Sequence, residues 1–112
     1  MAVAVVTLRP DIGANSFVAG KYVRDATPTA TNINVGFVPS MVKVINATDG
    51  DVSLTWTSDM PNGTGISDAG ALVATNGITP VDGTDGTNLG FLVGTDATVQ
   101  EASKTYSFVA WR

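Results

Sequence analysis

The chain has 112 residues, with ten acidic and six basic side chains, a formal net charge of −4, and neither His nor Cys. The two missing residue types exclude most acid–base and nucleophilic catalysis, together with disulfide staples and structural thiolate zinc. The six basic residues form no cluster, so neither nucleic acid nor a membrane surface is expected as a partner.

The N-terminal third predicts two strands. Residues 2–9 begin with an apolar run and predict a first strand that Pro10 closes, because proline cannot donate to a ladder. Residues 17–24 predict a second strand, with Gly20 as a bulge, before a polar Thr/Pro connection. Residues 1–30 are therefore either an N-terminal arm or an edge-strand region, beside a body at 31–112 in a single domain.

The middle of the chain predicts a β-hairpin. After an extended stretch at 32–37, residues 41–47 and 51–58 alternate with period two, and Asp49-Gly50 supplies the turn between them. On this pattern Val42, Val44 and Asn46 share one face of the first strand. Val52, Leu54 and Trp56 share one face of the second strand.

In the rest of the chain, Gly and Pro residues interrupt the extended segments more often. Residues 58–70 contain Pro61 and three glycines, and predict a long surface loop. Residues 82–88 have the chemistry of a tight turn. The remaining extended segments are residues 69–75, 77–81, 89–93 and 105–112.

These elements predict an all-β fold, a small antiparallel β-sandwich or jelly-roll-like barrel. Fifteen Val and fifteen Thr support it, because β-branched side chains fit the pleated surface of a strand better than a helix interior. Charged residues are only 14% of the chain, so much of its surface must be Thr, Ser, Asn, Gly and apolar atoms. Surfaces of this kind tend to contact other surfaces.

Several patterns suggest chemistry but have simpler structural explanations. The carboxylate pairs Asp59/Asp68 and Asp82/Asp85 lie in glycine-rich loops, where Asp usually forms turns. The oxygen ligands of residues 82–88 have the wrong spacing for an EF-hand. No catalytic, cofactor or metal site is therefore expected, and the chain is not expected to be an enzyme.

Two further patterns are weighed in the same way. Asn46 and Asn62 begin Asn-x-Thr glycosylation patterns, which chance alone would supply in a chain this rich in Thr. Trp56 and Trp111 would suit either a sugar-stacking platform or the interior of a small sandwich. We favour the interior, because a sugar site also needs exposed rings beside convergent polar groups.

From Gly36 onward the sequence resembles small virion proteins of tailed bacteriophages. The resemblance begins with the run GFVPSMVKVINATDGDVSLTWTSDM, residues 36–60. It continues through Asn76-Gly77-Ile78-Thr79, then Gly90-Phe91-Leu92-Val93-Gly94, and ends in the aromatic strand Tyr106 to Arg112. It covers about two-thirds of the chain and consists of spacing and turns; the first 35 residues do not carry it.

The resemblance implies a head decoration, or cement, protein. Such a protein binds the outside of the capsid, commonly as a homotrimer, with the major capsid protein as its partner, and is assembled in the host cytoplasm. A tail or fibre-base component and a carbohydrate-binding adhesin remain the alternatives. The contact residues expected for this role are Val3, Val5, Phe17, Tyr22, Met60 and Trp111.

Overall fold

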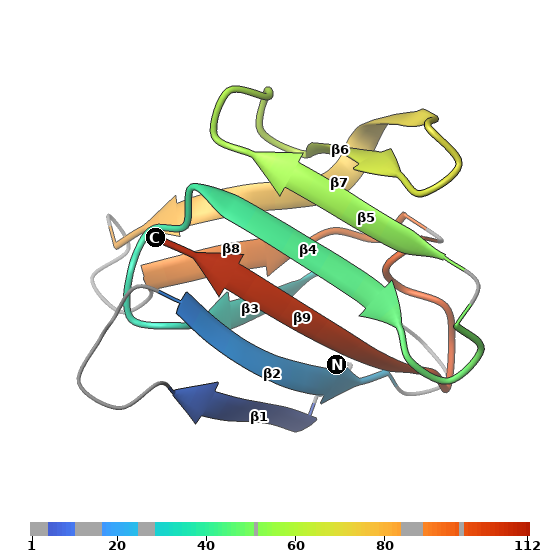
Figure 1. Ribbon diagram of the computed structural model, residues 1–112, viewed down its shortest axis with the longest axis horizontal. Coiled ribbons are helices and arrows are strands. Elements are labelled where there is room, and N and C mark those ends of the chain that lie inside the picture. Colours follow the sequence, from blue (N-terminus) through green and yellow to red (C-terminus); the bar gives the residue numbers. More distant parts are fainter. Residues whose placement is uncertain (1–4, 11–16, 25–28, 51, 84–88, 97) are drawn as a thin grey trace.

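A computed structural model describes residues 5–10, 17–24, 29–50, 52–83, 89–96 and 98–112. In these ranges nine strands form a single sheet in which every neighbouring pair is antiparallel (Figure 1). The strands are β1 (Val5–Pro10), β2 (Phe17–Val23), β3 (Thr31–Asn34), β4 (Met41–Asn46), β5 (Ser53–Thr57), β6 (Thr64–Ser67), β7 (Leu72–Asp82), β8 (Leu89–Val93) and β9 (Thr105–Trp111).

The sheet is curled, so that its two halves face each other. Its strand order is β1-β2-β9-β4-β5-β6-β7-β8-β3. The first five strands of that order form a front layer, β7, β8 and β3 form a back layer, and β6 lies where the sheet turns from one to the other (Figure 1). The all-β antiparallel fold expected from the sequence is confirmed, in the form of a half-barrel whose edges are β1 and β3.

The core fills the space between the two layers. Phe108 of the front layer meets Phe91 of the back layer edge to face, with ring centroids 5.4 Å apart, an arrangement that aromatic pairs favour. The other fully buried large apolar side chains come from both layers and are Tyr22, Ile33, Val42, Val44, Leu54, Trp56, Ile78, Val93 and Tyr106.

The hairpin expected at residues 41–58 is confirmed as β4 and β5. Val42, Val44, Leu54 and Trp56 face the core, as their alternation predicts. Gly50 has φ +68°, a conformation that glycine adopts without a steric penalty, and its N–H donates to the Asn46 carbonyl at 2.8 Å.

The first strand includes Pro10, and Gly20 is not a bulge. Residues 5–10 pair with β2 of the same chain, so this segment is an edge strand here instead of a free arm. Gly20 is in continuous register with Leu8 on one side and Phe108 on the other, which makes the bulge prediction wrong. Gly20 lies on the core-facing side of β2, between Val18 and Tyr22. Its lack of a side chain leaves room for neighbouring core residues.

The second half of the sheet departs further from the sequence-based expectation. The loop expected at residues 58–70 contains β6, and the segments expected at 69–75 and 77–81 are one strand, β7. The register jumps between these strands, because Thr64 pairs with Ile78 while Gly65 pairs with Val73. Residues 74–77 therefore bulge out of the ladder, and this bulge made one strand look like two.

Candidate docking face

The side of the front layer that faces away from the core carries large apolar side chains and two lysines. Strands β2, β9, β4 and β5 lie side by side in continuous register, so their outward residues form straight rows across the sheet. We call this surface the outer face. Its residues are Phe17, Ala19, Lys21, Val23, Met41, Lys43, Ile45, Ser53, Thr55, Thr57, Thr105, Ser107, Val109 and Trp111.

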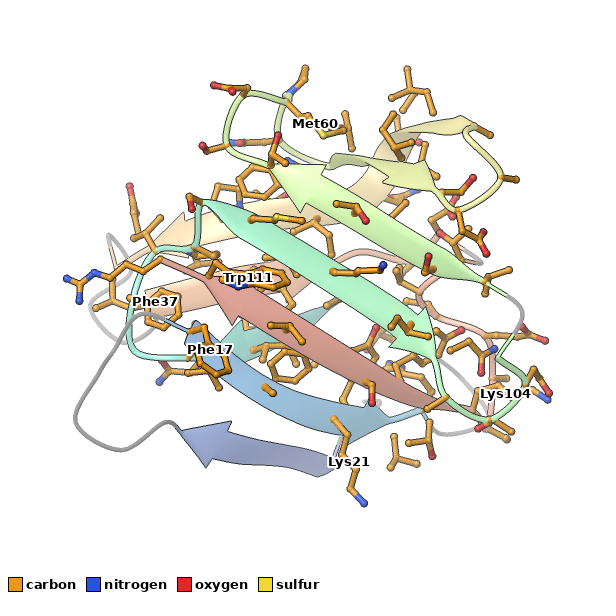
Figure 2. The ribbon with its side chains drawn as sticks, viewed as in Figure 1. Phe17, Lys21, Phe37, Met60, Lys104 and Trp111 are labelled. Atoms are coloured by element: carbon orange, nitrogen blue, oxygen red, sulfur yellow. The ribbon has the colours of Figure 1, made fainter. Side chains whose placement is uncertain are left out.

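One row of the outer face holds its largest side chains. Phe17, Trp111 and Met41 occupy matching register positions on three adjacent strands, and Thr57 completes the row. Figure 2 shows Phe17 and Trp111 on the near side of the front layer. Trp111 is 37% exposed, while Phe17 and Met41 are half-buried. Adjacent apolar side chains that form one patch on the solvent side of a sheet are a common feature of contact surfaces.

A second row extends the outer face toward the turn of the sheet. Across β2, β9, β4 and β5 this row consists of Ala19, Val109, Lys43 and Thr55. Its register continues into the pair Ile66 and Leu72 on β6 and β7, which are 39% and 64% exposed. Apolar positions therefore recur from one end of the row to the other, and Lys43 stands near its middle.

The charges of the outer face have one sign. Lys21 and Lys43 are its two charged residues, and both are exposed. The described acidic residues lie elsewhere, in turns, in loops or at a strand end: Asp49, Asp59, Asp68, Asp82, Asp96 and Glu101. A chain with a net charge of −4 thus presents an apolar and weakly cationic surface on this side.

The expected contact residues do not all reach this face. Phe17 and Trp111 do, whereas Met60 lies between β5 and β6, packs against the core, and accepts the Thr57 N–H at Sδ, 3.4 Å away. Val3 lies outside the described residues, and Val5 is described only by its place in β1. The outer-face residues Met41, Lys43 and Val109 were not expected, although their outward phase follows from the alternation of β4 and β9.

Tyr22 was expected at an interface, and the structure corrects this. Its side chain is fully buried, stacked on Tyr106 with ring centroids 5.2 Å apart, and its hydroxyl donates to the Val99 carbonyl at 2.9 Å. Burial raises the pKa of Tyr22 well above its ordinary value, with Tyr106 adding to the rise and Arg24 opposing it. The imperfect alternation around Gly20 hid the inward phase of this residue.

A buried polar cluster fixes the chain where it crosses from the front layer to the back. Arg24, which is 2% exposed, donates to the Thr31 hydroxyl at 2.8 Å and to the Thr29 carbonyl at 2.9 Å. Gln100 Nε2 donates to the same Thr29 carbonyl at 2.9 Å. Arg24 Nε and Gln100 Oε1 have no hydrogen-bond partner among the described residues. The cluster lies inside the fold, so it is a structural feature and not part of the outer face.

Burial rules out two of the other candidate sites from the sequence, those of Trp56 and Asn46. No group of three or more metal-ligating side chains forms in the described ranges, and most of residues 82–88 lie outside them. Trp56 is buried and its Nε1–H donates to the Pro61 carbonyl at 3.2 Å, so it offers no platform for a sugar. Asn46 is also buried, with its side chain bonded to Asp49 and to the turn backbone, which makes it inaccessible to glycosylation.

No family model, no curated protein and no solved structure matches the chain. Among the described residues there is also no helix long and apolar enough to cross a membrane.

Proposed function

We propose that this chain is a structural virion protein that decorates and stabilises the outer surface of a bacteriophage capsid. Its partner is the major capsid protein, and it assembles as a homo-oligomer, a trimer on the pattern of the proteins it resembles. It works by burying surface, with no chemical step.

The observation that carries the proposal is the outer face. Phe17, Met41 and Trp111 form a continuous row across three strands and remain partly exposed in the isolated chain. At roughly 25 cal/mol per Å² of apolar area removed from water, covering such a row contributes usefully to binding even in a small interface. Repetition by capsid symmetry then multiplies modest individual contacts through multivalency.

Two further properties fit a passive building block better than an enzyme or a lectin. The chain has no His or Cys to titrate near neutral pH or to act as a nucleophile. Of the two tryptophans considered for sugar stacking, Trp56 belongs to the core, and the neighbours of Trp111 in its row are the apolar Phe17 and Met41. A sugar site needs convergent polar groups beside the ring, and this row does not supply them.

The experiment is reconstitution on phage heads that lack the chain. Heads would be purified from phage with the gene deleted and mixed with the purified chain, and binding would be measured by co-sedimentation. Thermal release of DNA would then measure stabilisation. The proposal expects saturable binding and a higher release temperature. A chain that is absent from wild-type particles, or found only in purified tails, would contradict it.

A double variant sharpens the test. Phe17→Ser with Trp111→Ser removes the two aromatic rings of the row and is expected to abolish most binding to heads. Leu89→Ser is the matched control, because Leu89 is apolar and 39% exposed but belongs to β8 in the back layer. Sedimentation velocity on the free chain would show whether it is a trimer before it binds.

A further inference from the structure

The outer face differs in charge from the rest of the chain. Lys21 and Lys43 are exposed there, and no described residue forms a hydrogen bond or an ion pair with either ammonium group. No acidic residue occupies an outer-face position on β2, β9, β4 or β5. The described acidic residues therefore all lie off this surface, in a chain whose net charge is −4.

The two lysines are placed beside the apolar part of the face. Lys43 shares its row with Val109 and Ala19, while Lys21 lies one row further along, level with Ser107 and Ile45. They stand on β2 and β4, with β9 between them, so two strand spacings of about 4.8 Å separate their strands. A partner that covers Val109 would thus bring its own side chains within reach of both ammonium groups.

We propose that the outer face docks onto an apolar protein surface that carries carboxylates, with Lys21 and Lys43 paired to acidic side chains of the partner. The proposal rests on the function proposed above, in which that surface is the capsid shell. It adds the orientation of the chain, with β2, β9, β4 and β5 toward the shell, and the charge of the shell surface beneath it. Apolar burial supplies most of the affinity, and the charge pairs steer association and fix the docked orientation.

Other occupants fit the same face less well. Two copies packed outer face to outer face about a twofold axis would bring four lysines together with no acid between them. An anionic lipid surface would gain only about 1 kcal/mol from each lysine, which two lysines do not turn into stable attachment. Nucleic acid binding needs several phosphate contacts from a basic cluster, and this face holds two separated cations.

The test uses head binding as above, with the double variant Lys21→Gln, Lys43→Gln. Its control is Ala69→Glu, Ala102→Glu, which makes the same change of −2 in net charge at two exposed turn positions that are not among the outer-face residues. Dissociation constants would be measured from about 50 to 500 mM salt, a range over which the screening length falls from roughly 14 to 4 Å. Thermal unfolding would confirm that each variant folds.

The expected result is a clear difference between the two double variants. Binding of the wild-type chain weakens as salt rises, the lysine variant binds about 10-fold more weakly at low salt, and its salt dependence is largely lost. The control variant keeps the wild-type salt dependence. A lysine variant that binds heads like the wild type at every salt concentration would overturn the docking chemistry and leave the proposed function standing.

Three other outcomes also count against the proposal and identify the alternative. A wild-type chain that binds no heads would overturn the proposed function and this inference together. If sedimentation velocity shows that the lysine variant has a different oligomeric state while its head binding is unaffected, the outer face is a contact between copies of the chain. Lysine-dependent binding to vesicles with phosphatidylserine, again with head binding unaffected, would make it a membrane-binding surface.

Discussion

The two halves of the sheet are held together in different ways. Around β4, β5 and β9 the ladder is regular, and large side chains such as Leu54 and Phe108 fill the core. Around β6, β7 and β8, glycines allow the backbone itself to approach. A Cβ added at Gly77 would collide with the Thr64 carbonyl oxygen, and one added at Gly90 with the Ile33 carbonyl oxygen.

The difference shows where each half is vulnerable. The regular half loses stability when a side chain is removed, because a cavity is left behind. The glycine-rich half loses stability when a side chain is added, because the neighbouring backbone must move. The outer face belongs to the regular half, so its flat rows depend on the undistorted ladder of β2, β9, β4 and β5.

The largest effect is expected from Phe108→Ala. This change removes the ring that joins the layers through Phe91, and it should lower the free energy of unfolding by about 3–5 kcal/mol. Urea denaturation would measure the loss. Phe17→Ala is the control, because Phe17 is only half-buried and should lose clearly less. Equal losses at the two positions would show that the core is not where the structure places it.

Gly90→Ala is expected to lower the free energy of unfolding by a smaller amount, about 1–3 kcal/mol. The added methyl group meets the backbone of Ile33 and Val35 and forces β3 away from β8. Gly50→Ala is the matched control, because Gly50 has φ +68° and open space around it, and should lose only about 1 kcal/mol from the backbone conformation. A Gly90→Ala loss no larger than that of the control would contradict the close approach.

A third effect depends on pH. Because burial raises the pKa of Tyr22 above 10.0, folded Tyr22 keeps its proton at a pH where the unfolded chain has released it. Its contribution to stability is therefore fully present well below pH 10 and falls above it, with a slope that approaches about 1.4 kcal/mol per pH unit. In Tyr22→Phe the unfolding free energy should therefore fall by about 1 kcal/mol less between pH 10 and 11 than it does in the wild-type chain. An unchanged slope in the variant would contradict the burial of Tyr22.

The smallest effect is expected at the hairpin turn of the regular half. Lys104 Nζ lies 3.1 Å from Asp49 Oδ2, and both side chains are about one-third exposed. Lys104→Gln should lower the unfolding free energy by only about 0.5 kcal/mol, and 1 M salt should remove most of the difference. A loss above about 2 kcal/mol would contradict this expectation, because ion pairs that are this accessible to water contribute little to stability.

The same contrast explains what the sequence could predict. The hairpin was readable because period-two alternation and an Asp49-Gly50 turn are local signals, and β8 and β9 were found in the same way. The bulge at residues 74–77 was not readable, because it depends on the contact between Gly77 and Thr64, which the chain makes only after β6 has paired with β7. Apolar pattern alone also failed to separate the buried Tyr22 from the half-exposed Phe17, five residues away on the same strand.

For the outer face, the sequence supplied two of the large residues, Phe17 and Trp111, but not their arrangement. Their alignment with Met41 depends on β9 lying between β2 and β4, a long-range order that no local pattern encodes. The charge segregation follows from the same order. Lys21 and Lys43 are 22 positions apart in the sequence and share a surface only because the sheet brings their strands together.

The most direct test of the central claim is an electron cryomicroscopy map of the purified virion at a resolution that distinguishes strands. The account predicts density for this chain on the capsid shell, with β2, β9, β4 and β5 toward the shell and Trp111 buried at the contact. A map in which Trp111 and the two lysines face solvent, or in which the shell carries no such density, would contradict it.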